Sequence, residues 1–333
     1  MKFLTAQEAI DHELNVGDVY YTAEYGSSAE LIDGGRWECA LSSDGLVFPY
    51  IRRDISLDDT GHYDIVTPYG YGGVQAPSTA ALTAFRQEFV EESRQRGLVA
   101  EFVRGHPLDM TADMVRAWMP DATTTHSTFG VRVEADPEEY FTQAEGRHRT
   151  AVRKAQKNEL RIEEHPPESV LSAASPFRQI YAETMARVGA SARLRLGDDY
   201  FQRLASLGSD RLFALEALDA EGGTLAAALF MTNAGRMHYH LSGATPEGQK
   251  LGATNLIIDH AIRQHLVPGD WLHLGGGVTE GDGLSKFKRS IANIVHEMPM
   301  CRTVVNTEAY DRFNAHAGDP VTDYFPPYRA VIA

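Results

Sequence analysis

Three short apolar segments in the second half of the chain predict consecutive β-strands. Each has the length of a strand, and turns rich in aspartate, asparagine and glycine separate them. The segments are residues 211–218, 224–231 and 236–243. Because only short turns join them, they predict an antiparallel meander.

The third segment alternates between apolar and polar positions, which predicts two sets of side chains on opposite faces of the strand. One set is Met237, Tyr239 and Leu241. The other set is His238, His240 and Ser242. Small polar residues and glycines follow, and residues 256–266 then carry an apolar stripe with helical spacing. Pro268 and Gly269 end that helix, and residues 271–274 predict a further strand.

The first half of the chain repeats this order of elements. Residues 37–41, 45–51 and 63–67 predict three strands, which a glycine-rich turn follows. Residues 78–95 then predict a helix, and residues 98–104 predict the strand after it. Two such series predict mixed α/β sheets in two similar domains.

Length and composition agree with a globular protein of two domains. The chain has 333 residues, of which 43% are apolar. This composition excludes a mostly disordered chain. The 31 basic and 46 acidic side chains give a formal net charge of −15, which argues against extended contact with nucleic acid.

The sequence also bears on location and on redox chemistry. No apolar stretch approaches eighteen residues, so we expect no membrane span. The N-terminal residues become acidic before an apolar signal region forms, so we expect a cytoplasmic protein. The two cysteines, Cys39 and Cys301, are too few for a disulfide framework and lack metal-site spacing.

A basic segment lies between the two halves, at residues 146–161. Arg149, Arg153 and Lys157 are four residues apart and therefore share one face of a predicted helix, with Lys154 beside them. Two interpretations are open. The segment is either a solvated helix face or a binding surface for an anionic partner such as phosphate, which would offset the repulsion between like charges.

Five motifs in order along the chain carry a resemblance to a known family. They are residues 64–73, Arg149 with residues 153–158, residues 239–244 with 251–255, residues 273–277 with 283–289, and residues 324–329. From about residue 35 to the C-terminus this set resembles the Fem-like branch of the GNAT acyltransferase superfamily. The best-known members of that branch are peptidoglycan-bridge aminoacyltransferases, which take amino acids from aminoacyl-tRNA.

The resemblance implies a fold of two tandem GNAT-like domains, at residues 1–145 and 146–316, with a tail at about 317–333 that packs on the first. It implies an enzyme that transfers an aminoacyl group from aminoacyl-tRNA to an amino group of a peptide, amino acid or cell-envelope precursor. No bound cofactor and no metal are expected. An acyl-CoA-dependent N-acetyltransferase and a non-catalytic module that binds RNA or a polyanion remain alternatives.

The resemblance also assigns roles in catalysis. Phe287 would position the end of the donor, and Lys288 would stabilise the charge that develops on the attacked carbonyl. The other interpretation of Lys288 is an ordinary surface lysine. A general base is possible at His240, with Asp282 as its rival. The alternative for the histidines is a hydrogen-bonded position in a partly buried groove.

Candidates for donor and acceptor binding come from the resemblance and from the basic segment, and Arg36 is included although no motif supports it. For donor phosphates the candidates are Arg149, Arg153, Lys154, Lys157, Gly252, Gly275, Gly276 and Lys286. Gly252 lies in a segment that resembles the GNAT pyrophosphate loop, although Thr254 stands where that pattern has glycine or alanine. For the acceptor the candidates are Tyr181, Arg187 and Arg36, and the alternative for Arg187 is a helix-end contact with Glu183.

Overall fold

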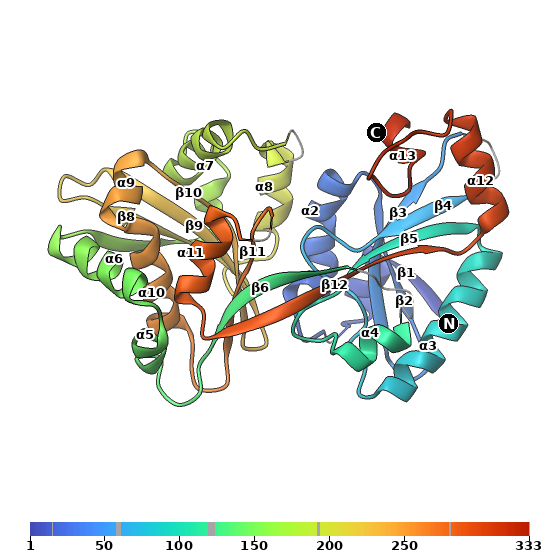
Figure 1. The fold of residues 1–333 in the computed structure, drawn as a ribbon, viewed down its shortest axis with the longest axis horizontal. Helices are drawn as coiled ribbons and strands as arrows, with labels where there is room; N and C mark the ends of the chain where they lie inside the picture. The colour runs from blue at the N-terminus through green and yellow to red at the C-terminus, as the bar shows by residue number, and fades with distance from the viewer. Residues whose placement is uncertain (15, 58–60, 119–123, 192–193, 280, 333) are drawn as a thin grey trace. The chain divides into compact units, whose positions relative to one another are not determined.

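The computed structural model describes the whole chain except residues 15, 58–60, 119–123, 192–193, 280 and 333. The described chain forms two compact units (Figure 1). Unit 1 consists of Met1–Val16, Tyr20–His126 and Glu297–Ala333, and unit 2 consists of Gly17–Val19 and Ser127–His296.

The domain boundary expected from the sequence lies after residue 145, and the expected tail begins at about residue 317. In the structure the chain changes unit between residues 126 and 127 and again between residues 296 and 297. Both changes fall inside strands, β6 (Thr124–Arg132) and β12 (Ile294–Val304). A boundary within a strand leaves no change of composition for a sequence pattern to detect.

The sheet of unit 1 has the strand order β1-β2-β3-β4-β5-β12. Its strands are β1 (Lys2–Thr5), β2 (Arg36–Leu41), β3 (Val47–Asp54), β4 (Tyr63–Val66) and β5 (Leu98–Arg104), with the C-terminal part of β12. Neighbours run antiparallel except β4 and β5, which are parallel. The helices are α1 (Ala6–Asp11), α2 (Ala23–Asp33), α3 (Thr79–Gln95), α4 (Ala112–Trp118), α12 (Thr307–His316) and α13 (Arg329–Ile332).

Helix α3 connects the two parallel strands of unit 1. It begins where the Ser78 hydroxyl accepts a hydrogen bond from the Ala81 N–H, and Gly97, with φ +95°, follows its end. Its apolar stripe buries Leu82, Phe85 and Phe89 in the core of the unit. The predicted helix and the strands on either side of it are therefore confirmed.

Unit 2 has the corresponding order β6-β11-β10-β9-β8-β7. The strands that follow β6 in the chain are β7 (Arg161–His165), β8 (Leu212–Leu218), β9 (Thr224–Asn233), β10 (Arg236–Ala244) and β11 (Trp271–Gly276). Strands β8 to β10 form the predicted antiparallel meander, and β7, which was not predicted, pairs antiparallel with β8. Strand β11 runs parallel to β10 and antiparallel to β6. The helices are α5 (Glu139–Gln143), α6 (Gly146–Lys157), α7 (Pro176–Arg187), α8 (Asp198–Ala205), α9 (Pro246–Leu251), α10 (Ala253–His265) and α11 (Gly283–Ile291).

Helices cover both faces of the unit 2 sheet. Val152 and Ala155 of α6 and Ile257 of α10 share one core cluster with apolar side chains of β8 to β11. On the other face, Gly243 of β10 packs against Ile180 of α7, where a Cβ on the glycine would lie 2.6 Å from the Ile180 carbonyl oxygen. Each unit thus has an antiparallel strand pair, a helix and a parallel strand in the same order, which confirms the predicted duplication.

The predicted faces of β10 are correct only for its first half. A β-bulge between Tyr239 and Leu241 shifts the register of β10 against β9. After the bulge Ala244 lies in the core cluster that also contains Met237, while Leu241 does not. The extra residue reverses the alternation, so the expected shared face of Met237 and Leu241 is wrong.

Helix α6 is shorter than the basic segment. It ends at Lys157, because Glu159 adopts φ +57° and the chain then enters β7 at Arg161.

Among the described residues no helix combines the length and the apolar character that crossing a membrane requires.

Candidate active site

The parallel strands β10 and β11 pair over only three residues and then separate. The last pair is His238 with His273, although β10 continues to Ala244 and β11 to Gly276. Both strands carry an irregularity beyond that pair, β10 between Tyr239 and Leu241 and β11 between His273 and Gly275. Bulges bend strands and interrupt ladders. The ladder between the two strands therefore ends at His238 and His273.

The side chain of Lys288, a residue of α11, contacts the end of β11 in this region. Helix α11 places its side chain so that Nζ donates a hydrogen bond to the carbonyl oxygen of Gly276 at 2.7 Å. The residue is 9% exposed, and this burial lowers the pKa of the ammonium to about 8, against the opposing charge of Asp282. Because the side chain is buried, the interpretation of Lys288 as an ordinary surface lysine is wrong.

Asp282 is placed to cap a helix, whereas the sequence predicted it as a possible general base. Its Oδ1 accepts a hydrogen bond from Ser285 N at 2.6 Å, and its Oδ2 accepts from Val278 N at 2.8 Å and from Thr279 N at 3.1 Å. These backbone hydrogen bonds, that of Ser285 first, lower the pKa of the carboxyl to about 2. Such a weak proton acceptor caps α11, and the structure therefore argues against Asp282 as a general base.

The neighbours of Lys288 are divided between core and surface. Phe287 is half-buried and packs against the core cluster of unit 2, whereas Lys286 and Arg289 are exposed. The carbonyl oxygen of Lys286 accepts a hydrogen bond from the Arg147 guanidinium of α6. The basic residues of α11 and the N-terminal end of α6 are thus in contact.

The glycines at the end of β11 and directly after it are explained by packing within unit 2. A Cβ on Gly276 would lie 2.8 Å from the Ser127 carbonyl oxygen, and Gly275 adopts φ +75°. A Cβ on Gly277 would lie 2.0 Å from Ser285 Oγ. The approach of neighbouring backbone and of the α11 cap accounts for these glycines without a ligand.

The basic face of α6 is partly used in the fold. Arg149 donates to the carbonyl oxygens of Thr142, at 3.1 Å, and of Ala144, and so caps α5. Lys154 Nζ donates to the carbonyl oxygen of Lys250 at 2.6 Å, at the end of α9. Arg153 and Lys157 remain exposed, with the Arg153 guanidinium 5.8 Å from the centre of the Phe141 ring.

A buried polar network fixes α6 on α10. His148 of α6 is fully buried, with Nδ1 2.9 Å from Asn255 Nδ2 and Nε2 3.4 Å from the Tyr140 hydroxyl. Burial, then the Arg149 charge, lowers the pKa of His148 to about 4, so the ring is neutral at neutral pH. Gly252 adopts φ +81° between α9 and α10, and a Cβ there would lie 2.6 Å from the Ala151 carbonyl oxygen.

The predicted acceptor residues already have partners. Arg187 donates to the carbonyl oxygen of Ala244 at 2.7 Å, and the Tyr181 hydroxyl donates to that of Leu194 at 3.0 Å. Arg36 lies in unit 1 and pairs with Asp54 at 3.1 Å. These contacts give Arg187 a capping role at the end of β10, and no hydrogen bond or ion pair to Glu183 is recorded for it among the described residues.

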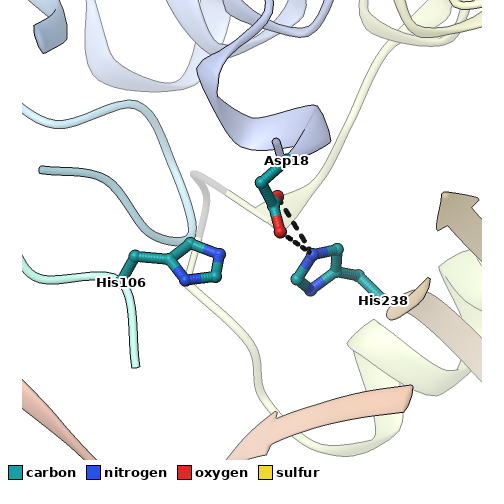
Figure 2. A group of neighbouring side chains, drawn as sticks. All are labelled: Asp18, His106 and His238. Atoms are coloured by element: carbon teal, nitrogen blue, oxygen red, sulfur yellow. Dashed lines mark hydrogen bonds and ion pairs between the residues drawn. The ribbon is translucent and has the colours of Figure 1, made fainter. Parts of the chain in front are cut away.

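The histidines of β10 have unequal environments. The Nε2 atom of His240 lies 2.7 Å from the Tyr200 hydroxyl of α8, and burial followed by the influence of His238 lowers the pKa of His240 to about 3. His240 is therefore neutral and a poor proton acceptor. His238, by contrast, is paired with Asp18 through its Nε2 atom, 3.0 and 2.9 Å from the two carboxylate oxygens (Figure 2). The third residue drawn there, His106, belongs to unit 1.

Asp18 was absent from the residues predicted from sequence. It lies 220 positions before His238 and belongs to a three-residue segment, Gly17–Val19, that is part of unit 2. No motif surrounds it, and a lone acidic residue in an acidic chain carries no signal. Only the tertiary structure brings it to the histidine.

Comparisons with known proteins agree with this architecture. Residues 143–289 match the family model described as an acetyltransferase (GNAT) domain. No curated protein sequence matches the chain. Several solved structures are similar to it at low sequence identity, which makes them evidence for the fold.

Three of these structures cover most of the chain. A structure titled FemX has a TM-score of 0.69 at 14% identity and covers 94% of this chain and 99% of its own. The C-terminal domain of a putative lysylphosphatidylglycerol synthetase from Agrobacterium fabrum has a TM-score of 0.58 at 14% identity, covering 94% and 96%. The structure of L-PGS from Bacillus licheniformis has a TM-score of 0.53 at 12% identity, covering 84% and 87%. Residues 143–289 thus match the family model of a GNAT acetyltransferase domain, and the fold of the chain as a whole is similar to that of these three structures.

Proposed function

We propose that this protein is an N-acyltransferase that moves an aminoacyl group from aminoacyl-tRNA to an amino group. The observation that carries the proposal is Lys288, a buried ammonium held at the end of β11 where β10 and β11 part. A fixed cation in a site from which water is excluded stabilises the oxyanion that forms when an amine attacks an ester. Phe287 and Lys288 also stand where the resemblance assigns the donor end and the charge-stabilising group.

The choice of a tRNA donor rests on the distribution of positive charge. The chain carries a net charge of −15, yet Arg153 and Lys157 are exposed on α6, and Lys286 and Arg289 are exposed on α11. The hydrogen bond from Arg147 to Lys286 joins the two helices. A short basic track of this kind suits the few phosphates of a tRNA acceptor end, and an acidic exterior limits wider contact.

A donor assay with purified protein tests the proposal. The protein is incubated with a mixture of charged tRNAs and, separately, with acetyl-CoA, each with amino acids, peptides and cell-envelope precursors as acceptors. Phosphatidylglycerol is included because one structural neighbour is named a putative lysylphosphatidylglycerol synthetase. We expect amide formation from charged tRNA, and a loss of about 10²-fold or more in kcat for Lys288→Ala. The exposed Lys2→Ala in unit 1 serves as the control.

The acyl-CoA alternative has one observation in its favour. The acetyltransferase domain match includes Gly252, whose left-handed conformation precedes α10 as a phosphate-binding turn would. Transfer from acetyl-CoA but not from charged tRNA would replace the proposed donor. Full activity of a folded Lys288→Ala variant would overturn the catalytic assignment. Salt-sensitive RNA binding without transfer from any donor would instead indicate a binding module.

A further inference from the structure

Asp18 and His238 form a buried acid–imidazole pair that the proposed reaction has not yet used. Asp18 is fully buried and His238 is 1% exposed. Both carboxylate oxygens lie within 3.0 Å of His238 Nε2 (Figure 2). Arg236 of the same strand lies 3.8 Å from the carboxylate. Burying the charge of an aspartate is costly unless a neighbouring group compensates it, and the contacts with His238 and Arg236 provide that compensation.

The carboxylate decides which ring nitrogen carries the proton. An ionised carboxylate only accepts hydrogen bonds, so the Nε2 atom of His238 must be the donor. In the neutral ring the lone pair that accepts a proton is then on Nδ1. A carboxylate that holds one tautomer and stabilises the imidazolium is the arrangement that makes histidine an effective base in acyl transfer.

The position of His238 matches this chemistry. It is the last residue of β10 that pairs with β11, and its ring lies 5.5 Å from the ring of His273, centre to centre, at 83°. Gly276 lies three residues after His273 on β11, and its carbonyl oxygen accepts the hydrogen bond from Lys288 Nζ. His238 thus pairs with β11 at His273, and the carbonyl that holds the ammonium lies roughly 10 Å further along that strand.

We propose that His238 is the proton acceptor for the attacking amine and that Asp18 is its positioning residue. The inference rests on the proposed aminoacyl transfer. The amine nitrogen forms a C–N bond with the ester carbonyl carbon and gives up a proton to Nδ1 of His238. The tetrahedral intermediate then breaks the ester C–O bond, and His238 returns the proton to the leaving ribose oxygen. The products are an amide and a free hydroxyl, and Asp18 keeps its charge throughout.

The other titratable and charged groups of unit 2 around this ring support the assignment. Arg236 lies near the Asp18 carboxylate and favours its ionised form. His240, on the same strand, is neutral and engaged with Tyr200. His273 faces the ring edge-on from β11. Of the bases considered, Asp282 is occupied by the α11 cap and His240 contacts Tyr200, whereas His238 contacts the fully buried carboxylate of Asp18.

The test compares His238→Gln and Asp18→Asn with the wild-type protein in the same transfer assay. Glutamine retains an amide N–H for the hydrogen bond to Asp18 but cannot accept a proton. We expect kcat to fall about 10²-fold for His238→Gln, with KM for both substrates within about threefold. Asp18→Asn should lower kcat about tenfold or more, because the tautomer is no longer held. His265→Gln, a histidine at the end of α10, is the matched control.

A second measurement distinguishes a role of His238 as a base from a purely structural role. Methoxyamine is unprotonated at neutral pH, so it needs less help from a base, and its transfer rate is measured with the uncatalysed rate subtracted. We expect the defect of His238→Gln to shrink at least tenfold with this acceptor. The assignment is overturned by an equal defect with both amines, by a rise in KM alone, or by full activity. Thermal unfolding identifies a variant that fails to fold. If His238→Gln fails to fold, the kcat of Asp18→Asn decides the assignment. An inactive wild-type protein with every donor would overturn the proposed function and this inference together.

Discussion

At the scale of single residues, burial separates Lys288 from the basic residues beside it. Lys286 and Arg289 are exposed, while the Lys288 side chain reaches back to the Gly276 carbonyl. In the linear sequence the three are equivalent members of a basic helix. The difference is one of helix phase, because the face of α11 that carries Ile291 enters the core and brings Lys288 with it.

The buried charge of Lys288 should cost stability, which gives the first prediction. The pKa of this lysine is lowered from 10.5 to about 8, so below pH 8 the fold carries a charge that burial disfavours. We expect Lys288→Met to raise the free energy of unfolding at pH 7 by about 1–2 kcal/mol, after allowance for the lost hydrogen bond. Urea unfolding measures this change, and the same variant should be inactive.

The sign of the pH dependence provides the control for that prediction. Between pH 8 and 10.5 the unfolded chain retains the proton that the folded protein has lost, so wild-type stability should rise through this range from this group. Lys288→Met should lack that rise. A variant less stable than the wild type at pH 7 would show that the hydrogen bond to Gly276 outweighs the cost of burial.

At the scale of secondary-structure elements, α6 and α10 are held together by contacts that need particular small and polar residues. His148 joins Tyr140 and Asn255, and Gly252 lies against the Ala151 backbone. Tyr140 in turn donates to the buried Asp259, which Arg263 also binds at 2.9 Å. The basic helix is therefore a fixed part of unit 2.

Gly252 gives the second prediction. Alanine there would be strained at φ +81° and would place its Cβ 2.6 Å from the Ala151 carbonyl oxygen, so the α6 backbone would have to move. We expect Gly252→Ala to lower the free energy of unfolding by at least about 2 kcal/mol more than Gly222→Ala. Gly222 is a matched control, because its φ is +89° and nothing lies within 4 Å of its added Cβ. Equal losses in urea unfolding would contradict the packing argument.

At the scale of the whole molecule, a net charge of −15 coexists with a local basic track on α6 and α11. The net charge suppresses non-specific binding to polyanions, and the track provides a small number of cations for one ligand. This arrangement predicts that donor binding is weak, selective and sensitive to salt.

The third prediction follows from that distribution. We expect Arg153→Glu together with Lys157→Glu to reduce kcat/KM for charged tRNA about tenfold or more at low salt, with kcat little changed at saturation. The slope of log affinity against log salt should become shallower by about 1–2. Arg312→Glu, an exposed change on α12 of unit 1, is the control. An equal loss with the control would point to net charge in place of the track.

The predicted elements agree with the structure where the pattern is local. The strand at Leu98–Arg104 and the meander of β8 to β10 follow from alternation and turns over a few residues. The faces of Leu241 and Ser242 were predicted wrongly, since one bulge residue reverses an alternation and leaves the composition unchanged. The domain boundary was placed elsewhere because the chain changes unit inside β6 and β12.

The sequence by itself determined the central series of strands, helix and strand in each half, the repeated plan of the two units, and the motifs that carry the resemblance. These depend on short-range periodicity and on neighbouring residues. The tertiary structure alone decided that Lys288 is buried, that Arg187 and Asp282 are occupied by backbone groups, and that Asp18 meets His238 across 220 positions. Burial and long-range pairing set the electrostatics of a site, and neither leaves a trace in the local order of residues.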